Sequence, residues 1–137
     1  MLEVLLAEDN LADVVLVGQA LQEYGVECRL HVVKDGAKAL DFVARMGKSE
    51  DVPCPDLMLL DLNLPKATGA EVLAEFRKHP ECAHTPVIVV SSSDAQADRD
   101  RVAKLGIAHY FRKPSNLESF LLLGAVVREV VAGKNAG

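Results

Sequence analysis

Chemically useful side chains stand directly after four of the short apolar runs in this sequence. Glu8 and Asp9 follow the first run, and Asp61 follows the third. A row of serines at 91–93 follows the fourth run, and Lys113 follows the fifth. Carboxylates that lie close together repel one another and ionise poorly unless a cation separates them. A hard divalent cation such as Mg²⁺ meets this need with few protein oxygens and several waters.

Phosphoryl transfer is the chemistry that this set of residues favours. With a cation bound, one carboxylate can act as a nucleophile toward phosphorus. The transferred group then needs its charge balanced by the cation and by a lysine, while a hydroxyl and a backbone N–H take its remaining oxygens. Each residue alone has a plainer interpretation, such as a helix cap or a turn. Their joint placement predicts a site that accepts a phosphoryl group on Asp61.

Short apolar runs alternate with longer amphipathic stretches, and this alternation predicts the fold. The runs that read as strands cover 3–7, 28–33, 56–60, 87–90 and 108–112. Three of them are apolar nearly throughout, as is typical of strands buried on both faces of a parallel sheet. The stretches that read as helices cover about 11–24, 37–46, 69–79, 95–106 and 116–132. We therefore expect an α/β fold, a doubly wound five-stranded parallel sheet in the flavodoxin-like order 2-1-3-4-5 with five helices.

A single domain over 1–132 accounts for the whole pattern. The irregular stretch 47–55 is rich in Gly, Pro and charge, and we interpret it as a surface loop because neither side of it could close a sheet alone. Residues 133–137 are expected to form a short disordered tail. In a doubly wound sheet, ligands bind outside the carboxyl ends of the strands, which is where the acids, serines and lysine stand.

Composition limits the kinds of partner that the protein could bind and the cell compartment in which it could work. The chain has 137 residues and a net charge of −5 without a basic stripe, so nucleic acid is not expected as a partner. No leader opens the sequence and no apolar run approaches the ~20 residues of a membrane helix, so we expect a cytoplasmic protein without membrane contact. Cys28, Cys54 and Cys82 have no CxxC spacing, and in the cytosol we expect reduced thiols.

Four motifs resemble those of the receiver domains of two-component response regulators. They are LLAEDN at 5–10, LMLLDLNLPKATG at 57–69, VIVVSSS at 87–93 and YFRKP at 110–114. The resemblance covers Leu2 to about Ala132. Similarity to single-domain regulators paired with bacterial phytochromes comes from the motif DLNLPKATGAEVL and from the long loop before the third strand.

The resemblance implies a role for each matching residue of the acceptor site. Asp61 would be the phosphoacceptor, and Lys113 would pair with its carboxylate and then with the phosphoryl group. Mg²⁺ would be bound by Asp61, by Asp9 directly and by Glu8 largely through water. The backbone carbonyl of Asn63 would complete the protein ligands, and no organic cofactor is expected.

The resemblance also implies a conformational switch. The hydroxyl of Ser91 and the backbone N–H of Ser92 would bond the phosphoryl group, and Tyr110 would turn inward upon phosphorylation. Two residues depart from the commoner family pattern: Glu8 stands where many receivers have Asp, and Ser91 replaces the more frequent Thr. Three residues would shape the neighbouring loops, namely Pro65, Gly69 and Pro114, with a cis peptide bond before Pro114.

The family resemblance implies partners as well. The phosphoryl donor would be a sensor histidine kinase such as a bacterial phytochrome. Because no DNA-binding segment follows the receiver, we expect the output to be contact with a downstream protein that phosphorylation controls. The chain would not be an enzyme beyond its own phosphorylation and slow autodephosphorylation.

Three other functions fit these residues less well. A flavodoxin-type electron carrier would need a Ser/Thr/Gly-rich phosphate loop after the first strand, where Glu8, Asp9 and Asn10 would repel a phosphate. A phosphatase with an aspartyl nucleophile would need a second acid two residues after Asp61, where Asn63 stands. A scaffold that is never phosphorylated would have no use for the complete set of chemical groups.

The last predicted helix carries two apolar rows at helical spacing. The first row, which would rest on the sheet, consists of Phe120, Leu123, Val127 and Val131. The second row, turned by about a quarter of the circumference, consists of Leu122, Val126 and Val130. Exposed apolar strips usually mark a partner surface, so we expect a homodimer through this fifth helix. The helix could instead pivot to bury both rows, or the kinase or the target could cover the second row.

Overall fold

The computed structural model describes residues 1–49 and 51–136 and contains one sheet whose strands are all parallel. The strands are β1 (Leu2–Ala7), β2 (Cys28–Val33), β3 (Leu57–Leu60), β4 (Val87–Ser91) and β5 (His109–Arg112). Their order is β2-β1-β3-β4-β5, so the predicted fold and strand order are confirmed. Every residue of β3 and of β4 is buried, which explains why these segments are apolar without alternation.

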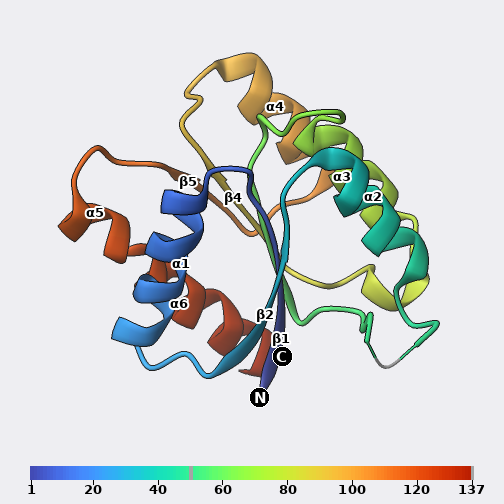
Figure 1. Ribbon diagram of the computed structural model, residues 1–137, viewed down its shortest axis with the longest axis horizontal. Helices are drawn as coiled ribbons and strands as arrows, with labels where there is room; N and C mark the ends of the chain where they lie inside the picture. The colour runs from blue at the N-terminus through green and yellow to red at the C-terminus, as the bar shows by residue number, and fades with distance from the viewer. Residues whose placement is uncertain (50, 137) are drawn as a thin grey trace.

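Helices cover both faces of the sheet (Figure 1). They are α1 (Leu11–Glu23), α2 (Gly36–Arg45), α3 (Gly69–Arg77), α4 (Gln96–Leu105), α5 (Leu117–Leu121) and α6 (Leu123–Ala136), with a 3₁₀ turn η1 (Pro80–Cys82). One face packs against α1, α5 and α6, and the other packs against α2, α3 and α4. Across 1–49 and 51–136, none of the helices has the length and apolar character needed to cross a membrane.

Polar side chains cap the starts of α1, α2, α3 and α5. Asn10 caps α1, as its place before the helix suggests, by accepting from the backbone N–H of Asp13 at 3.1 Å. Thr68 caps α3 in a reciprocal capping box with Glu71. Both caps lie in loops at the carboxyl ends of strands, so they hold the loops that follow β1 and β3.

The helical segment predicted after β5 differs in detail from the expectation. A hydrogen-bonded turn at Leu122 divides it into α5 and α6. The expected disordered tail at 133–137 is also corrected, because α6 continues to Ala136; Gly137 lies outside the described residues. Gly133 and Asn135 are poor helix formers, so composition alone favours a frayed end, and the helix continues there as an extension of the turns before it.

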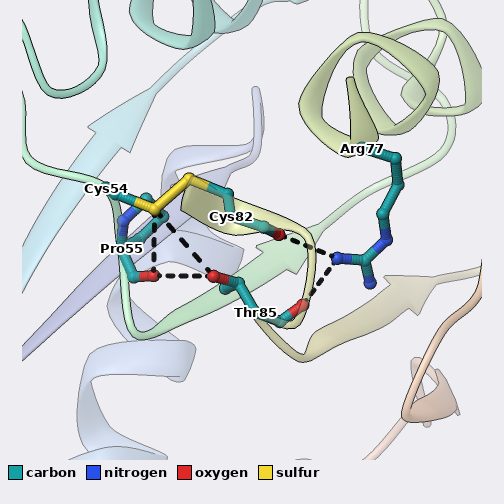
Figure 2. Close-up of a disulfide and its surroundings, with 5 residues drawn as sticks. All are labelled: Cys54, Pro55, Arg77, Cys82 and Thr85. Carbon is teal, nitrogen blue, oxygen red and sulfur yellow. Dashed lines mark hydrogen bonds between the residues drawn. A yellow bond between two sulfur atoms is a disulfide. The ribbon is translucent and has the colours of Figure 1, made fainter. Parts of the chain in front are cut away.

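A disulfide joins Cys54 and Cys82, whose Cα atoms are 6.2 Å apart (Figure 2). The expectation of three reduced thiols is therefore wrong for this pair, while Cys28 is free. The bond links the loop before β3 to η1, at the amino ends of the strands and so at the opposite end of the sheet from the predicted site. Next to it, Thr85 Oγ1 donates to the carbonyl of Pro55 at 3.2 Å. The two cysteines lie 28 residues apart, and only the folded topology brings them together.

Arg77, the last residue of α3, stabilises the loops at the same end of the sheet. Its guanidinium donates to the carbonyls of Cys82 and Thr85, at 3.3 and 2.7 Å (Figure 2). It also donates to the carbonyls of Leu105 and Gly106 at the end of α4, at 3.4 and 2.7 Å. Five N–H donors in a fixed fork allow one arginine to serve several carbonyls at once. The lower edge is therefore tied together by a covalent bond and by one side chain.

Candidate functional site

The carboxyl ends of β1, β3, β4 and β5 lie side by side, and they bring the predicted residues together at the upper edge of Figure 1. Ala7 pairs with Leu60 in the sheet register, so Glu8 and Asp61 leave their strands at the same level. The backbone N–H of Asp61 donates to the carbonyl of Ala7 at 3.0 Å. On the other side of β4, the N–H of Lys113 donates to the carbonyl of Ser91 at 2.8 Å.

Lys113 is the centre of the charged network. Its Nζ lies 2.7 Å from Glu8 Oε1, 2.8 Å from Asp13 Oδ2 and 3.0 Å from Asp61 Oδ2. An ammonium has three donors, and here three carboxylates accept from it. Burial disfavours the ammonium, but the bonds to Asp13, Glu8 and Asp61 outweigh burial and raise the pKa of Lys113. The lysine is therefore charged and held in place at the acceptor.

Asp13 is a member of this network that the sequence reasoning missed. It lies in the first turn of α1 and its side chain is 20% exposed. Its position three residues after the cap Asn10 is the signal that could have found it. The first turn of a helix that follows a strand faces the same sheet edge as the strand end.

Glu8, Asp9 and Asp61 form the candidate metal centre. Carboxylate oxygens from these three residues all lie within 4.8 Å of one another. Glu8 is buried at 1% exposure, and its burial, together with repulsion from Asp61, raises its pKa to about 7 despite contacts with Lys113 and the Asn10 N–H. Hard oxygen donors with excess negative charge suit a divalent cation, and Mg²⁺ fits this donor set.

Asn63 follows the acceptor in an exposed loop. Its backbone N–H donates to Asp61 Oδ1 at 3.0 Å, so both carboxylate oxygens of Asp61 are engaged, one by this N–H and the other by Lys113. The predicted metal contact of the Asn63 carbonyl stays a prediction. Two hydrogen bonds, one to each oxygen, fix the direction in which the carboxylate oxygens point.

The predicted switch residues are connected through Ser93. Ser91 is fully buried and its Oγ accepts from the N–H of Ser93 at 3.1 Å. The hydroxyl of Tyr110 donates to the carbonyl of Ser93 at 2.7 Å. The guanidinium carbon of Arg99 lies 4.3 Å from the centroid of the Tyr110 ring, a cation–π contact. Ser92, between the two bonded serines, is exposed at the end of β4.

The loop residues hold the acceptor strand close to its neighbours. At Gly69, an added Cβ would meet the carbonyl oxygen of Asp61 at 2.5 Å and the Cα of Leu62 at 2.7 Å, so α3 approaches the acceptor only because this residue is glycine. The carbonyl of Pro65 accepts from the N–H of Gly36 at 2.8 Å, which links this loop to α2. The peptide bond before Pro114 is trans, which corrects the predicted cis bond; trans is the form of lower energy for most prolines.

Comparison with known proteins decides the family. The sequence profile of the response regulator receiver domain matches residues 4–123. The chain belongs to this family. Response regulator Rcp1 of Synechocystis sp. is 38% identical over 115 residues, which cover 84% of this chain and 78% of Rcp1.

Solved structures of other receivers share the fold, and some of them hold a metal ion or are phosphorylated. The crystal structure of Mn²⁺-bound Rcp1 matches with a TM-score of 0.82 and 34% identity. The match covers 93% of this chain and 92% of the Rcp1 chain. The phosphorylated cyanobacterial phytochrome response regulator RcpA has a TM-score of 0.85 and 34% identity, with 97% and 95% coverage. A receiver domain of the sensor histidine kinase PA1611 of Pseudomonas aeruginosa has a magnesium ion in its active-site cleft, a TM-score of 0.71 and 25% identity, with 95% and 93% coverage.

Proposed function

We propose that this receiver accepts a phosphoryl group on Asp61 from the phosphohistidine of a sensor histidine kinase. The observation that carries the proposal is the engagement of Asp61 by Lys113 and by the Asn63 N–H beside Glu8. A carboxylate oxygen of Asp61 would form a bond to phosphorus as the P–N bond to the imidazole breaks. The electron pair of the broken bond returns to the imidazole, and the product is an acyl phosphate on Asp61.

Each neighbouring group has a defined task in this step. Lys113 keeps its charge in the buried site and would balance the charge of the phosphoryl oxygens. Mg²⁺ would be held by Glu8, Asp9, Asp61 and the carbonyl of Asn63, and when bound it neutralises negative charge on the transferred group. The metal-bound receivers among the solved relatives support a divalent cation in this site. Apart from self-phosphorylation and slow autodephosphorylation, no enzymatic activity is proposed.

The signal would leave the site through Ser91 and Tyr110. The Ser91 hydroxyl and the Ser92 N–H would bond the phosphoryl oxygens, and the bond between Ser91 and Ser93 would then be replaced. Because Ser93 also accepts from Tyr110, its movement would release the tyrosine to turn inward. The proposed output is a changed surface around β4 and β5 that a downstream protein recognises.

A bacterial phytochrome is the kinase that we propose as the donor. RcpA is described as a phytochrome response regulator, and a second solved relative is the bacteriophytochrome response regulator RtBRR, with 33% identity and a TM-score of 0.75. The chain covers 95% of the RcpA chain and 76% of the RtBRR chain. We propose that the chain is a regulator of this type and that it acts in the cytoplasm.

We also propose a homodimer through the fifth predicted helix. Phe120, Leu123 and Val127 of the first apolar row are buried against the sheet. In the second row, Leu122 is 51% exposed, and Val126 and Val130 are half-buried. The rest of the protein therefore covers this row only in part. A second copy of the same surface would cover the remainder.

Intact mass spectrometry tests the proposed phosphorylation. Incubation with a small acyl phosphate and Mg²⁺ should add the mass of one phosphoryl group, and EDTA should prevent the addition. The variant Asp61→Asn keeps the size of the side chain but lacks the nucleophilic carboxylate, so it should gain no mass. Labelling that persists in Asp61→Asn would refute the assignment of the acceptor.

A further inference from the structure

Asp13 differs from the other carboxylates at the site in what it contacts. It bonds Lys113 Nζ at 2.8 Å from α1, whereas the metal centre consists of Glu8, Asp9 and Asp61. Lys113 therefore has three carboxylate partners, of which Glu8 and Asp61 also belong to the metal centre. Asp13 is the partner of the lysine that the cation would not share.

The two shared partners are weakened by the proposed chemistry. A cation at the metal centre would bind oxygens of Glu8 and Asp61, whose carboxylates also accept hydrogen bonds from the Lys113 ammonium. Phosphorylation then makes the Asp61 carboxyl oxygen part of a neutral ester-like linkage and moves the negative charge outward to the phosphoryl oxygens, so Lys113 loses this partner at its present place. The ion pair to Asp13 is outside both changes and remains to hold the lysine.

The backbone around Asp13 gives this contact a fixed geometry. The N–H of Asp13 donates to the capping side chain of Asn10, and Asn10 N–H in turn donates to Glu8 Oε2 at 3.2 Å. The side chain of Asp13 thus projects from a capped helix start that is itself tied to the site. Lys113 is fixed at its backbone by the bond to the Ser91 carbonyl.

We propose, on the basis of the proposed function, that Asp13 is a positioning residue for Lys113. Its carboxylate holds the ammonium beside the acceptor while Glu8 and Asp61 turn to the cation and the phosphoryl group. The lysine can then bond the phosphoryl oxygens without first being ordered, which lowers the entropic cost of the contact.

The sign of one measurement separates positioning from simple electrostatics. Removing a negative charge near the site should, by Coulomb attraction alone, strengthen the binding of an anion. Loss of a positioning residue should instead weaken it, because the lysine that binds the anion is less ordered. Beryllofluoride, an anionic mimic of the phosphoryl group on a carboxylate, is the suitable probe.

The experiment compares beryllofluoride affinity at saturating Mg²⁺ in four full-length proteins: wild type, Asp13→Asn, Asp13→Glu and Glu23→Gln. Glu23 is exposed at the far end of α1, about 15 Å from Asp13 along the helix axis, so its variant is a control for net charge. Asp13→Asn should bind roughly fivefold more weakly, as expected for one partly exposed ion pair. Asp13→Glu should recover part of the loss, and Glu23→Gln should match wild type.

A second readout needs neither metal nor anion. In the metal-free protein, the ¹H–¹⁵N signal of the Lys113 ammonium should be visible in wild type and broadened in Asp13→Asn, because a less ordered ammonium exchanges its protons with water faster. Affinity in Asp13→Asn that equals or exceeds wild type, or Asp13→Glu as weak as Asp13→Asn, would overturn the role of Asp13. Wild-type protein that binds no beryllofluoride would overturn the proposed function and this inference together.

Discussion

Glu8 shows how the excess of negative charge acts on a single residue. It is buried at the end of β1, shares Lys113 with Asp13 and Asp61, and has a pKa raised to about 7 by burial first and by Asp61 second. In the unfolded chain the same carboxyl has a pKa near 4.5. Between these values the folded state holds a proton that the unfolded state has released.

This difference predicts how stability depends on pH. The contribution of Glu8 to the free energy of unfolding is fully present below pH 4.5 and is lost as pH rises through about 7. The metal-free protein should therefore lose roughly 2 kcal/mol from this group between pH 5 and pH 7.5. Urea denaturation in EDTA measures the loss, and Glu8→Gln is the control without the titrating group. Equal pH dependence in the two proteins would contradict the raised pKa.

Among the elements, the strand ends carried most of what the sequence could reveal. Parallel strands bring their carboxyl ends to one edge, so the residues directly after each apolar run could be placed together without coordinates. Asp13 could not be found in the same way, because a residue within a helix reaches the site only if the cap fixes that helix in one orientation. The break at Leu122 depends on local packing that no pattern in this sequence encodes, whereas the trans bond before Pro114 is the usual form of an X–Pro bond and only the family resemblance argued against it.

The connection between β4 and β5 predicts the behaviour of a switch variant. Ser91→Ala removes the hydroxyl that accepts from Ser93, and it leaves Asp61 and Lys113 unchanged. The variant should still bind beryllofluoride, yet the NMR shifts of Tyr110 and its neighbours should respond much less than in wild type. Wild-type shifts that do not change on adding beryllofluoride would contradict a switch at Tyr110.

The covalent link between the loop before β3 and η1 predicts a simple count of thiols. Under denaturing conditions without reductant, iodoacetamide should modify Cys28 alone, because Cys54 and Cys82 are joined. After reduction, all three cysteines should be modified, and intact mass distinguishes the two products. Modification of three residues before reduction would show that the pair is not bonded in solution. The sequence alone could not pair them, since an odd number of cysteines without close spacing leaves every pairing open.

At the scale of the whole molecule, the proposals involve two separate surfaces, one for phosphorylation and one for pairing with a second copy. The upper end of the sheet would receive the phosphoryl group, while α6 and the end of α5 carry the partly covered apolar row. The disulfide and Arg77 stabilise the opposite edge, away from both surfaces. We therefore expect changes at the acceptor to reach β4 and β5 while the opposite end of the sheet stays fixed.

The homodimer predicts a specific response to one surface substitution. Leu122→Glu places a charge on the apolar row and should convert a dimer to a monomer near 15 kDa in sedimentation at micromolar concentration. Val15→Glu is the matched control, since Val15 on α1 is 59% exposed and lies outside the row. Wild type that sediments as a monomer, or a dimer that both variants leave intact, would contradict pairing through this helix.

The central claim is that Asp61 carries the phosphoryl group, and chemical trapping tests it most directly. Borohydride reduces an acyl phosphate to an alcohol, which marks the modified residue for peptide mass spectrometry. After incubation with a phosphorylated histidine kinase or an acyl phosphate in Mg²⁺, the mark should appear at Asp61 and should be absent when EDTA is present. A mark on another residue, or one that forms equally well in EDTA, would contradict the account of the site.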